Sequence, residues 1–280
     1  MTGPFLRYPG SKWRLADWIC GHLPAHRIYL EPYVGSGAVF FSKRPAPVET
    51  INDLDGELVN LFMVVRETPE ALARAVSLTP YSRAEHRAVW DVVATADPVE
   101  RARRYLARIW MNHGMKTSRH GGWAHTRSAA SAAGGCSSRV PAWNQIPERI
   151  MAAVERLRHA QIECRDALEV ISDYARPDCL IYADPPYLLS TRGERQYQHE
   201  MEDAQHSDLL NALTAHPGPV VLSGYGSALY DERLIGWRRV ATAALAEAGA
   251  RRTEILWLNP VTVRRLERER SQATLLEVPA

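Results

Sequence analysis

The sequence has no run of eighteen apolar residues, and its first residues, MTGPFLRYPGSKWRL, lack the charged-then-apolar layout of a signal peptide. We therefore expect no membrane-spanning helix, no targeting segment and no membrane among the partners of this chain. Its 280 residues are 46% apolar and 24% charged, which is typical of a globular protein rather than a disordered or fibrous one. This length suits one large α/β domain or two modest domains.

Cysteine is scarce, and its spacing excludes two kinds of site. The four cysteines lie far apart, with no Cys-x-x-Cys pair, at Cys20, Cys136, Cys164 and Cys179. This spacing argues against both a zinc site and a disulfide framework, and it fits a reducing cytoplasm. The ten histidines show no metal-ligand spacing either, so we predict no metal site.

Acidic residues are absent from residues 101–147, although the whole chain has a formal net charge of only +2. This segment contains eight basic residues: Arg101, Arg103, Arg104, Arg108, Lys116, Arg119, Arg127 and Arg139. Trp110, Trp123 and Trp143 lie in the same segment, and arginine with aromatics is the mixture that contacts phosphates and stacks on bases. The spacing of apolar residues in RARRYLARIW fits a solvated basic helix as well, but 47 residues without an acid favour a nucleic-acid surface.

Short β-type runs recur along the chain, with helical patterns between most of them. The predicted strands are residues 28–31, 49–52, 161–164, 179–183, 219–223, 237–242 and 253–258. The intervening helices include residues 11–20, 54–66 and 207–215. Strands alternating with helices indicate a mostly parallel sheet covered on both faces, and the short link between the last two strands favours an antiparallel edge hairpin.

This alternation stops between the second and third strands. Residues from about 67 to 150 read as helices, with PEALARAV, SRAEHRAVWDVVA and VERARRYLARIW, followed by a long irregular stretch. That stretch contains SAASAAGGCSS, which is small and polar and is expected to be mobile. We therefore predict a catalytic domain of residues 1–66 and 155–280, interrupted by a helical insertion of residues 67–154 that grips a polyanion.

A glycine turn follows the first strand in YLEPYVGSGAVFF. Gly35 and Gly37 would let a ligand approach backbone N–H groups, although such a turn needs no ligand by itself. Asp53 follows eighteen residues after Gly35, the spacing at which nucleotide-binding α/β folds place an acid on ribose hydroxyls. Phe40 and Phe41 stand where a dinucleotide site needs a third glycine, so an adenosine without phosphates, such as S-adenosylmethionine, fits better.

The fourth predicted strand ends in ADPPY. Because ligand sites in open α/β sheets lie at the carboxyl ends of strands, Gly35, Asp53, Asp166 and Asp184 are expected to share one rim. A plain turn is the simplest interpretation of Asp-Pro-Pro. Beside the other residues of this rim, however, the Asp184 carboxylate and the Pro185 carbonyl oxygen form two fixed acceptors. Two acceptors at one point suit an exocyclic amine. A base inside a duplex would have to be flipped out to reach them.

Together these motifs resemble the Dam-type adenine-specific DNA methyltransferases, especially the short phage and prophage members. PFLRYPGSKWRL is similar to the family's N-terminal cofactor motif, YLEPYVGSGAVFF to its glycine motif and ADPPY to its catalytic motif. VVLSGYGSALYDE and RRTEILWLNP resemble its closing strands, so the likeness covers most of the chain. It implies a Rossmann-like methyltransferase sheet of about seven strands, with the helical insertion acting in target recognition.

The resemblance also implies a role for individual residues. The predicted catalytic loop is Asp184, Pro185, Pro186 and Tyr187, with Tyr187 stacking on the base. The predicted contacts to S-adenosylmethionine are Tyr8, Lys12, Gly35, Ser36, Gly37, Asp53, Asp166 and Asp184, where Asp53 holds the ribose and Asp166 the adenine. The predicted DNA-binding residues are Arg104, Arg108, Lys116, Arg119, Arg127 and Arg139. The implied enzyme is a site-specific, bacterial or phage-encoded methyltransferase that acts in the cytoplasm on adenine N6 in double-stranded DNA, without an obligate protein partner.

Two departures from the family pattern limit what the resemblance implies. Tyr8-Pro9 and Ser11 replace the usual residues around Lys12, and residues 111–140 keep only a hint of the recognition hairpin, so no target sequence is carried over. Methylation of RNA or of a protein glutamine, or an inactive DNA-binding module, are the alternative functions. For the loop STRGERQYQHE, closure over a base and plain flexibility are equally compatible with the sequence.

Overall fold

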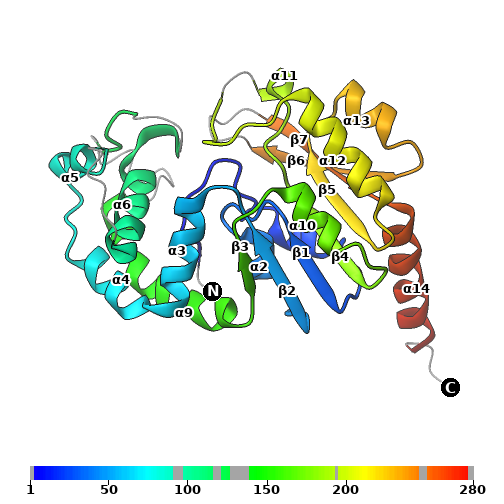
Figure 1. The fold of residues 1–280 in the computed structure, drawn as a ribbon, viewed down its shortest axis with the longest axis horizontal. Helices are drawn as coiled ribbons and strands as arrows, with labels where there is room; N and C mark the ends of the chain where they lie inside the picture. The colour runs from blue at the N-terminus through cyan, green and yellow to red at the C-terminus, as the bar shows by residue number, and fades with distance from the viewer. Residues whose placement is uncertain are drawn as a thin grey trace.

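One seven-stranded sheet forms the centre of the computed structural model, which describes residues 3–90, 97–115, 121–126, 139–192, 195–245 and 251–276 (Figure 1). The strands are β1 (Ile28–Glu31), β2 (Val48–Asn52), β3 (Gln161–Glu163), β4 (Cys179–Ala183), β5 (Val220–Gly224), β6 (Arg238–Leu245) and β7 (Arg251–Leu258). Their order is β3-β2-β1-β4-β5-β7-β6; strands β1 to β5 pair in parallel, and β7 is antiparallel to both β5 and β6. The predicted α/β sheet with an antiparallel edge is confirmed.

Strand β4 shows why the central strands read as unbroken apolar runs. All five of its residues are buried, because side chains that alternate along a strand enter a core on each face of the sheet. Leu180 and Tyr182 join the core on one face, while Cys179, Ile181 and Ala183 join the core on the other. The second core is completed by α10 (Ala167–Asp173), α12 (Asp203–Ala215) and α13 (Ala228–Arg233). The first core is completed in part by α1 (Ala16–Cys20), α2 (Ala38–Ser42) and α14 (Pro260–Leu276).

The predicted insertion is helical and lies to one side of the sheet, at the left of Figure 1. Its helices are α4 (Pro69–Ser77), α5 (Arg83–Ala88), α6 (Pro98–Met111), the 3₁₀ turn η1 (His113–Met115), α8 (Arg139–Asn144) and α9 (Ile146–Arg158). Of these, α4, α6 and α9 pack on α3 (Gly56–Glu67), which follows β2, while α5 packs on α6 and α8 on α9. The stretch SAASAAGGCSS lies outside the described residues.

Helix α6 buries the stripe that the sequence indicated. Tyr105, Leu106, Ile109 and Trp110 are all buried, and they recur at helical spacing on the face that meets α3 and α4. Asp97 begins the helix by accepting the backbone N–H of Val99. The basic side chains of α6 are therefore left on its other faces.

Two helices differ from the sequence-based expectation. The helix expected over residues 11–20 begins only at Ala16, because the chain first makes turns in which Ser11 N–H donates to Tyr8 and Leu15 N–H donates to Lys12. Helix α9 was expected as irregular chain, and it runs through the predicted boundary at residue 154 while packing on both α3 and α4. Its buried residues include Ile150 and Leu157, and it is stabilised by tertiary packing rather than by a strong local start signal.

Candidate active site

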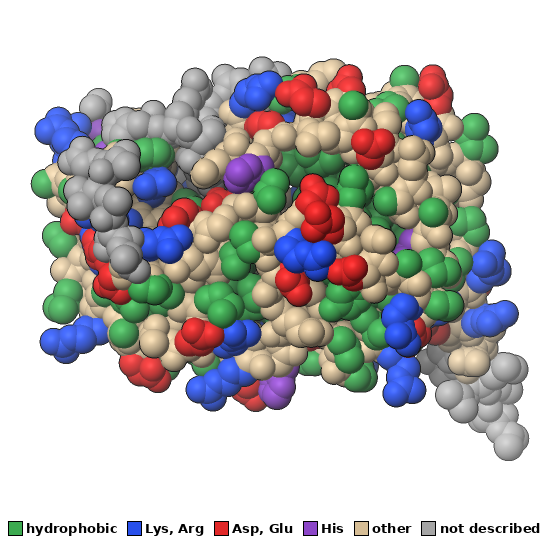
Figure 2. All heavy atoms as spheres, viewed as in Figure 1, with side chains coloured by type: hydrophobic (Ala, Val, Ile, Leu, Met, Phe, Trp, Pro, Cys, Tyr) green, Lys and Arg blue, Asp and Glu red, His purple; other side chains and the backbone are tan. Residues whose placement is uncertain are grey.

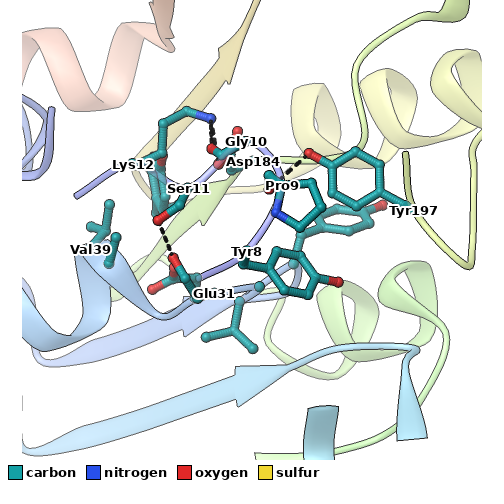
Figure 3. A pocket seen from close by; sticks show the side chains of 15 residues that line it. Tyr8, Pro9, Gly10, Ser11, Lys12, Glu31, Val39, Asp184 and Tyr197 are labelled. Atoms are coloured by element: carbon teal, nitrogen blue, oxygen red, sulfur yellow. Dashed lines mark hydrogen bonds and ion pairs between the residues drawn. The ribbon is translucent and has the colours of Figure 1, made fainter. Parts of the chain in front are cut away.

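The carboxyl ends of β1, β2 and β4 meet at the point where the strand order changes direction, and a cavity opens there. The cavity has a volume of about 130 Å³, and the four residues predicted to share one rim, Gly35, Asp53, Asp166 and Asp184, all line it. Tyr8 and Pro186 line it as well. A smaller adjoining cavity is lined by Lys12, Ser36 and Asp184 (Figure 3). The structure therefore brings the predicted cofactor and catalytic residues together, with Gly37 in the turn behind them.

The turn after β1 requires both of its glycines. Gly35 and Gly37 have φ angles of 47° and 67°, in the left-handed region that side chains disfavour. A Cβ atom on Gly35 would lie 3.2 Å from the Tyr8 ring, and one on Gly37 would lie 2.7 Å from the Phe41 ring. The turn is also held from outside, since Ser36 Oγ lies 2.8 Å from Ser11 Oγ.

Asp53 and Asp166 place two carboxylates on the cavity wall. Asp53 accepts the backbone N–H groups of Gly35 and Asp55, each at 3.0 Å, and burial raises its pKa to about 6. Asp166 begins α10 by accepting the N–H of Leu168 at 2.8 Å. It remains exposed to the cavity. Each carboxylate retains lone pairs for further donors.

Lys12 and Asp184 form a largely buried ion pair. Lys12 Nζ lies 2.9 Å from Asp184 Oδ2 and donates to the Gly10 carbonyl at 2.9 Å (Figure 3). Burial disfavours the charged lysine, but Asp184 and Glu254 outweigh that effect and raise the pKa of Lys12. Burial raises the pKa of Asp184, while Lys12 acts to lower it. The ion pair thus favours the charged form of each group against the effect of burial.

The second oxygen of Asp184 has no hydrogen-bond partner within the described ranges. Asp184 Oδ1 is buried and accepts no hydrogen bond from the part of the chain that the structure describes. An acceptor left unpaired away from water destabilises a fold, so such an atom in a native protein indicates a ligand, a water or a catalytic role. It lies beside Pro185 and Pro186, neither of which has an N–H group to satisfy it.

Tyr187 is more deeply buried than the sequence suggested. Its side chain is 8% exposed, and its hydroxyl donates to Glu254 and lies 3.2 Å from Ser223 Oγ. The ring meets Tyr225 edge-on, with centroids 4.6 Å apart, and Lys12 Nζ lies 4.8 Å from the ring centroid. The orientation of the ring is thus set by contacts within the protein.

Two further residues beside Tyr187, Glu254 and Ser223, were not among the predicted site residues. Both are buried, and Ser223 Oγ donates to Glu254 Oε1 at 2.8 Å. The signal that would have found Glu254 is a carboxylate directly before the buried run ILWL of β7. Glu31, which was expected to act as a support, is also buried, accepts the Tyr29 hydroxyl at 2.7 Å and has its pKa raised to about 8 by burial.

The segment after the catalytic loop lies across the cavity. Tyr197 lines both cavities, and its hydroxyl donates to the Pro9 carbonyl at 3.2 Å (Figure 3). Arg192 forms a buried ion pair with Glu200, which also accepts the N–H of Tyr197. These contacts hold Tyr197 against Pro9, where it lines both cavities.

The basic segment is neutralised over much of α6. Arg101 pairs with Glu57, Arg103 with both Glu85 and Glu100, and Arg104 with Glu100 at 2.8 Å. All three acids lie outside residues 101–147, so counting charge within that segment overstated the free positive charge of this helix. On the face drawn in Figure 2, blue and red side chains are interspersed rather than separated.

The other predicted DNA-binding residues fall into two groups. Arg108 donates to the Val89 carbonyl at 3.1 Å and lies 4.8 Å from the Trp90 ring centroid. Arg139 lies near Tyr81, where burial raises the pKa of the tyrosine and Arg139 opposes that shift. Lys116, Arg119 and Arg127 lie outside the described residues. The expected role of these residues in DNA binding stays a prediction.

Residues 111–113 and 122–124 pair in antiparallel fashion, in the region where the sequence keeps only a hint of the recognition hairpin. Asn112 bridges Trp123, the N–H of His113 donates to Gly122, and that of Ala124 donates to Met111. The Trp123 ring stacks on the His125 ring, with the centroids 4.7 Å apart. The guanidinium of Arg83, on α5, lies 4.6 Å from the Trp123 ring centroid.

The described ranges contain neither a membrane-spanning helix nor a cluster of metal-ligating side chains. No helix in them combines the length and apolar character needed to cross a membrane. Within the same ranges, no three His, Cys, Asp or Glu side chains are grouped in a way that would hold a metal ion.

The strand order, the glycine turn after β1, the acid after β2 and the Asp-Pro-Pro-Tyr loop after β4 define a Rossmann-like methyltransferase. Residues 8–233 match the family D12 class N6 adenine-specific DNA methyltransferase, and the chain belongs to this family, which methylates adenine N6 in DNA.

Relatives in several bacteria support the assignment. The chain is 25% identical over 266 residues to the type II methyltransferase M1.LlaDCHI of Lactococcus lactis subsp. cremoris, covering 82% of this chain and 83% of the relative. It is 24% identical over 246 residues to the DNA adenine methylase of Salmonella typhi, covering 81% and 82%. It is 26% identical over 190 residues to the DNA adenine methylase of Vibrio cholerae serotype O1 (strain ATCC 39541 / Classical Ogawa 395 / O395), covering 67% and 66%.

Proposed function

We propose that this enzyme methylates an adenine flipped out of double-stranded DNA, with S-adenosylmethionine as the methyl donor and Asp184 as the residue that binds the reacting amine. The buried, unpaired Oδ1 of Asp184 carries this proposal. An amine N–H directed at Oδ1 satisfies an acceptor for which the described protein provides no donor. Lys12 occupies only Oδ2, so the second oxygen remains available.

The proposed chemistry needs two acceptors at one point. The Asp184 carboxylate and the Pro185 carbonyl would each accept one N6 hydrogen, which favours the pyramidal amine and makes its lone pair available. The positive charge that develops on N6 as the new N–C bond forms would then face the Asp184 carboxylate. As this bond forms, the bond between the methyl group and the sulfonium sulfur would break and leave S-adenosylhomocysteine, and one of the two N6 protons would pass through the Asp184 carboxylate to solvent. Tyr187 would provide the surface on which the base rests.

The cavity walls suit the cofactor. Asp53 and Asp166 provide acceptors for ribose hydroxyls and for an adenine amine, while Pro32, Leu54 and Met201 provide apolar surface. Gly35 leaves room that a Cβ atom would take from Tyr8. When bound, S-adenosylmethionine supplies a methyl group activated by a positively charged sulfur. Lys12, Ser36 and Gly37 would complete its surroundings.

Asp184→Ala tests the assignment. Transfer of labelled methyl to duplex DNA is expected to fall roughly 10²- to 10³-fold, while the variant keeps its fold. Wild-type transfer by Asp184→Ala would refute the role of this residue. Single-stranded DNA, RNA and glutamine-containing peptide are compared as acceptors in the same assay, and preference for any of them over duplex DNA would refute the proposed substrate.

A further inference from the structure

Glu254 is an acid in a place where the fold needs an apolar residue. It is 3% exposed, and the four residues that follow it on β7, Ile255 to Leu258, are all buried. A carboxylate taken out of water is unfavourable by several kcal/mol unless donors surround it. Packing of β7 within the sheet therefore gives no reason for an acid at this position.

Two of the groups around Glu254, the Tyr187 hydroxyl and Lys12 Nζ, belong to the proposed methyl-transfer site. The Tyr187 hydroxyl and Ser223 Oγ both donate to Glu254 Oε1, and Lys12 Nζ lies 3.8 Å from the same oxygen. Lys12 is at the same time the ion-pair partner of Asp184 at 2.9 Å. Glu254 thus contacts the tyrosine that ends the catalytic loop and the lysine that pairs with the aspartate that begins it.

These contacts constrain two groups at once. With its hydroxyl held by Glu254 and its ring edge-on against Tyr225, Tyr187 has little freedom to rotate. With carboxylates on both sides, Lys12 is kept over the Tyr187 ring rather than extended toward solvent. A site held in this way before substrate arrives loses less entropy when a base enters.

We propose that Glu254 is a positioning residue for methyl transfer, which fixes the Tyr187 ring through its hydroxyl and holds Lys12 against Asp184. This inference rests on the proposed function, because it assigns Glu254 to the same reaction. Glu254 acts through Tyr187 and Lys12 and does not itself touch the base or the methyl donor.

The test uses the full-length enzyme and the conservative change Glu254→Gln, which keeps one acceptor oxygen for Tyr187 and removes the charge beside Lys12. We expect kcat to fall by about tenfold or more, with KM for DNA and cofactor affinity within about threefold. Glu49→Gln is the matched control, since Glu49 is also buried but pairs with Lys43 and Arg156. That control is expected to lower the melting temperature while the folded enzyme keeps its kcat.

A double-mutant cycle separates positioning from general destabilisation. Tyr187→Phe removes the hydroxyl that Glu254 holds, and Glu254→Ala removes the acceptor, so the losses in kcat from Glu254→Ala and Tyr187→Phe should overlap by about fivefold rather than multiply. Independent, multiplicative losses would overturn the inference, as would a wild-type kcat for Glu254→Gln. Asp184→Ala is measured alongside: if it is inactive while Glu254→Gln is normal, only this inference fails, whereas normal transfer by Asp184→Ala removes the proposed function itself.

Discussion

Charged side chains are paired differently at the carboxyl edge of the sheet and on helix α6. At the sheet edge, Asp184 and Glu254 share Lys12, and Asp184 Oδ1 has no partner among the described residues. On α6, Arg101 pairs with Glu57 of α3 and Arg103 with Glu85 of α5, while Arg104 pairs with Glu100 of the same helix. Paired surface ions contribute little and are screened by salt, whereas an unpaired buried oxygen is costly and needs a ligand. Local pairing, rather than the formal charge of a segment, therefore locates the site.

Lys12→Met should have the largest effect, because it leaves Asp184 buried without its cation. We expect methyl transfer to fall about 10²-fold and unfolding to become easier by about 3 kcal/mol. Removing Lys12 should also raise the pKa of Asp184 further, since burial already raises it and Lys12 opposes that shift. The acidic limb of the kcat–pH profile should thus move to higher pH. An unchanged limb would show that ionisation of Asp184 does not govern the rate.

Gly10→Ala should weaken cofactor binding by roughly tenfold, as measured by calorimetry. Gly10 has a φ of 67°, and a Cβ atom there would overlap the Tyr197 hydroxyl. In a Tyr197→Phe background the overlap disappears while the backbone strain remains, so the loss should be smaller. Gly236→Ala is the control, since its φ is 88° with nothing within 4 Å of the added atom. An equal loss of cofactor affinity in both backgrounds would show that overlap with the Tyr197 hydroxyl does not affect cofactor binding.

Cofactor affinity should depend on the protonation of Asp53. Burial raises its pKa to about 6, with nearby Asp55 adding to the shift and the N–H groups of Gly35 and Asp55 opposing it. Above that pH the carboxylate is charged and accepts hydroxyl donors; below it the group is protonated. Calorimetry should therefore show affinity falling by up to about tenfold from pH 8 to pH 5. Asp53→Asn should be weak at both pH values and nearly flat, and a steep fall in that variant would assign the titration to another group.

Arg104→Ala should have the smallest effect, because Glu100 already pairs with Arg104. We expect DNA affinity within about threefold of the wild type and a salt slope changed by less than about 0.9, the value for one phosphate contact. Burial acts to raise the pKa of Glu100, but the hydrogen bonds from Arg103 and Arg104 dominate and lower it to about 2, so this acid is charged at any pH of the assay. A salt slope smaller by the value of one full phosphate contact would show instead that Arg104 leaves Glu100 to bind a DNA phosphate.

The strands, the glycine turn and the rim of acids were predictable from the sequence, because each depends on local chemistry. Buried runs such as CLIYA predict central strands, and the order of elements along a parallel sheet places Gly35, Asp53 and Asp184 at the same edge. Helix α9 was not predictable in the same way, because its stability depends on packing against α3 and α4.

The sequence by itself determined the methyltransferase motifs, the parallel sheet and the location of the helical insertion, since these depend on residue types and spacings that act over a few neighbours. Only the tertiary structure decided which charges meet. Glu57 and Glu85 reach the arginines of α6, and Glu254 reaches Tyr187 across 67 residues of chain. Ion pairs and buried hydrogen bonds depend on distances of a few ångströms between elements far apart in the chain, and residue order alone does not specify those distances.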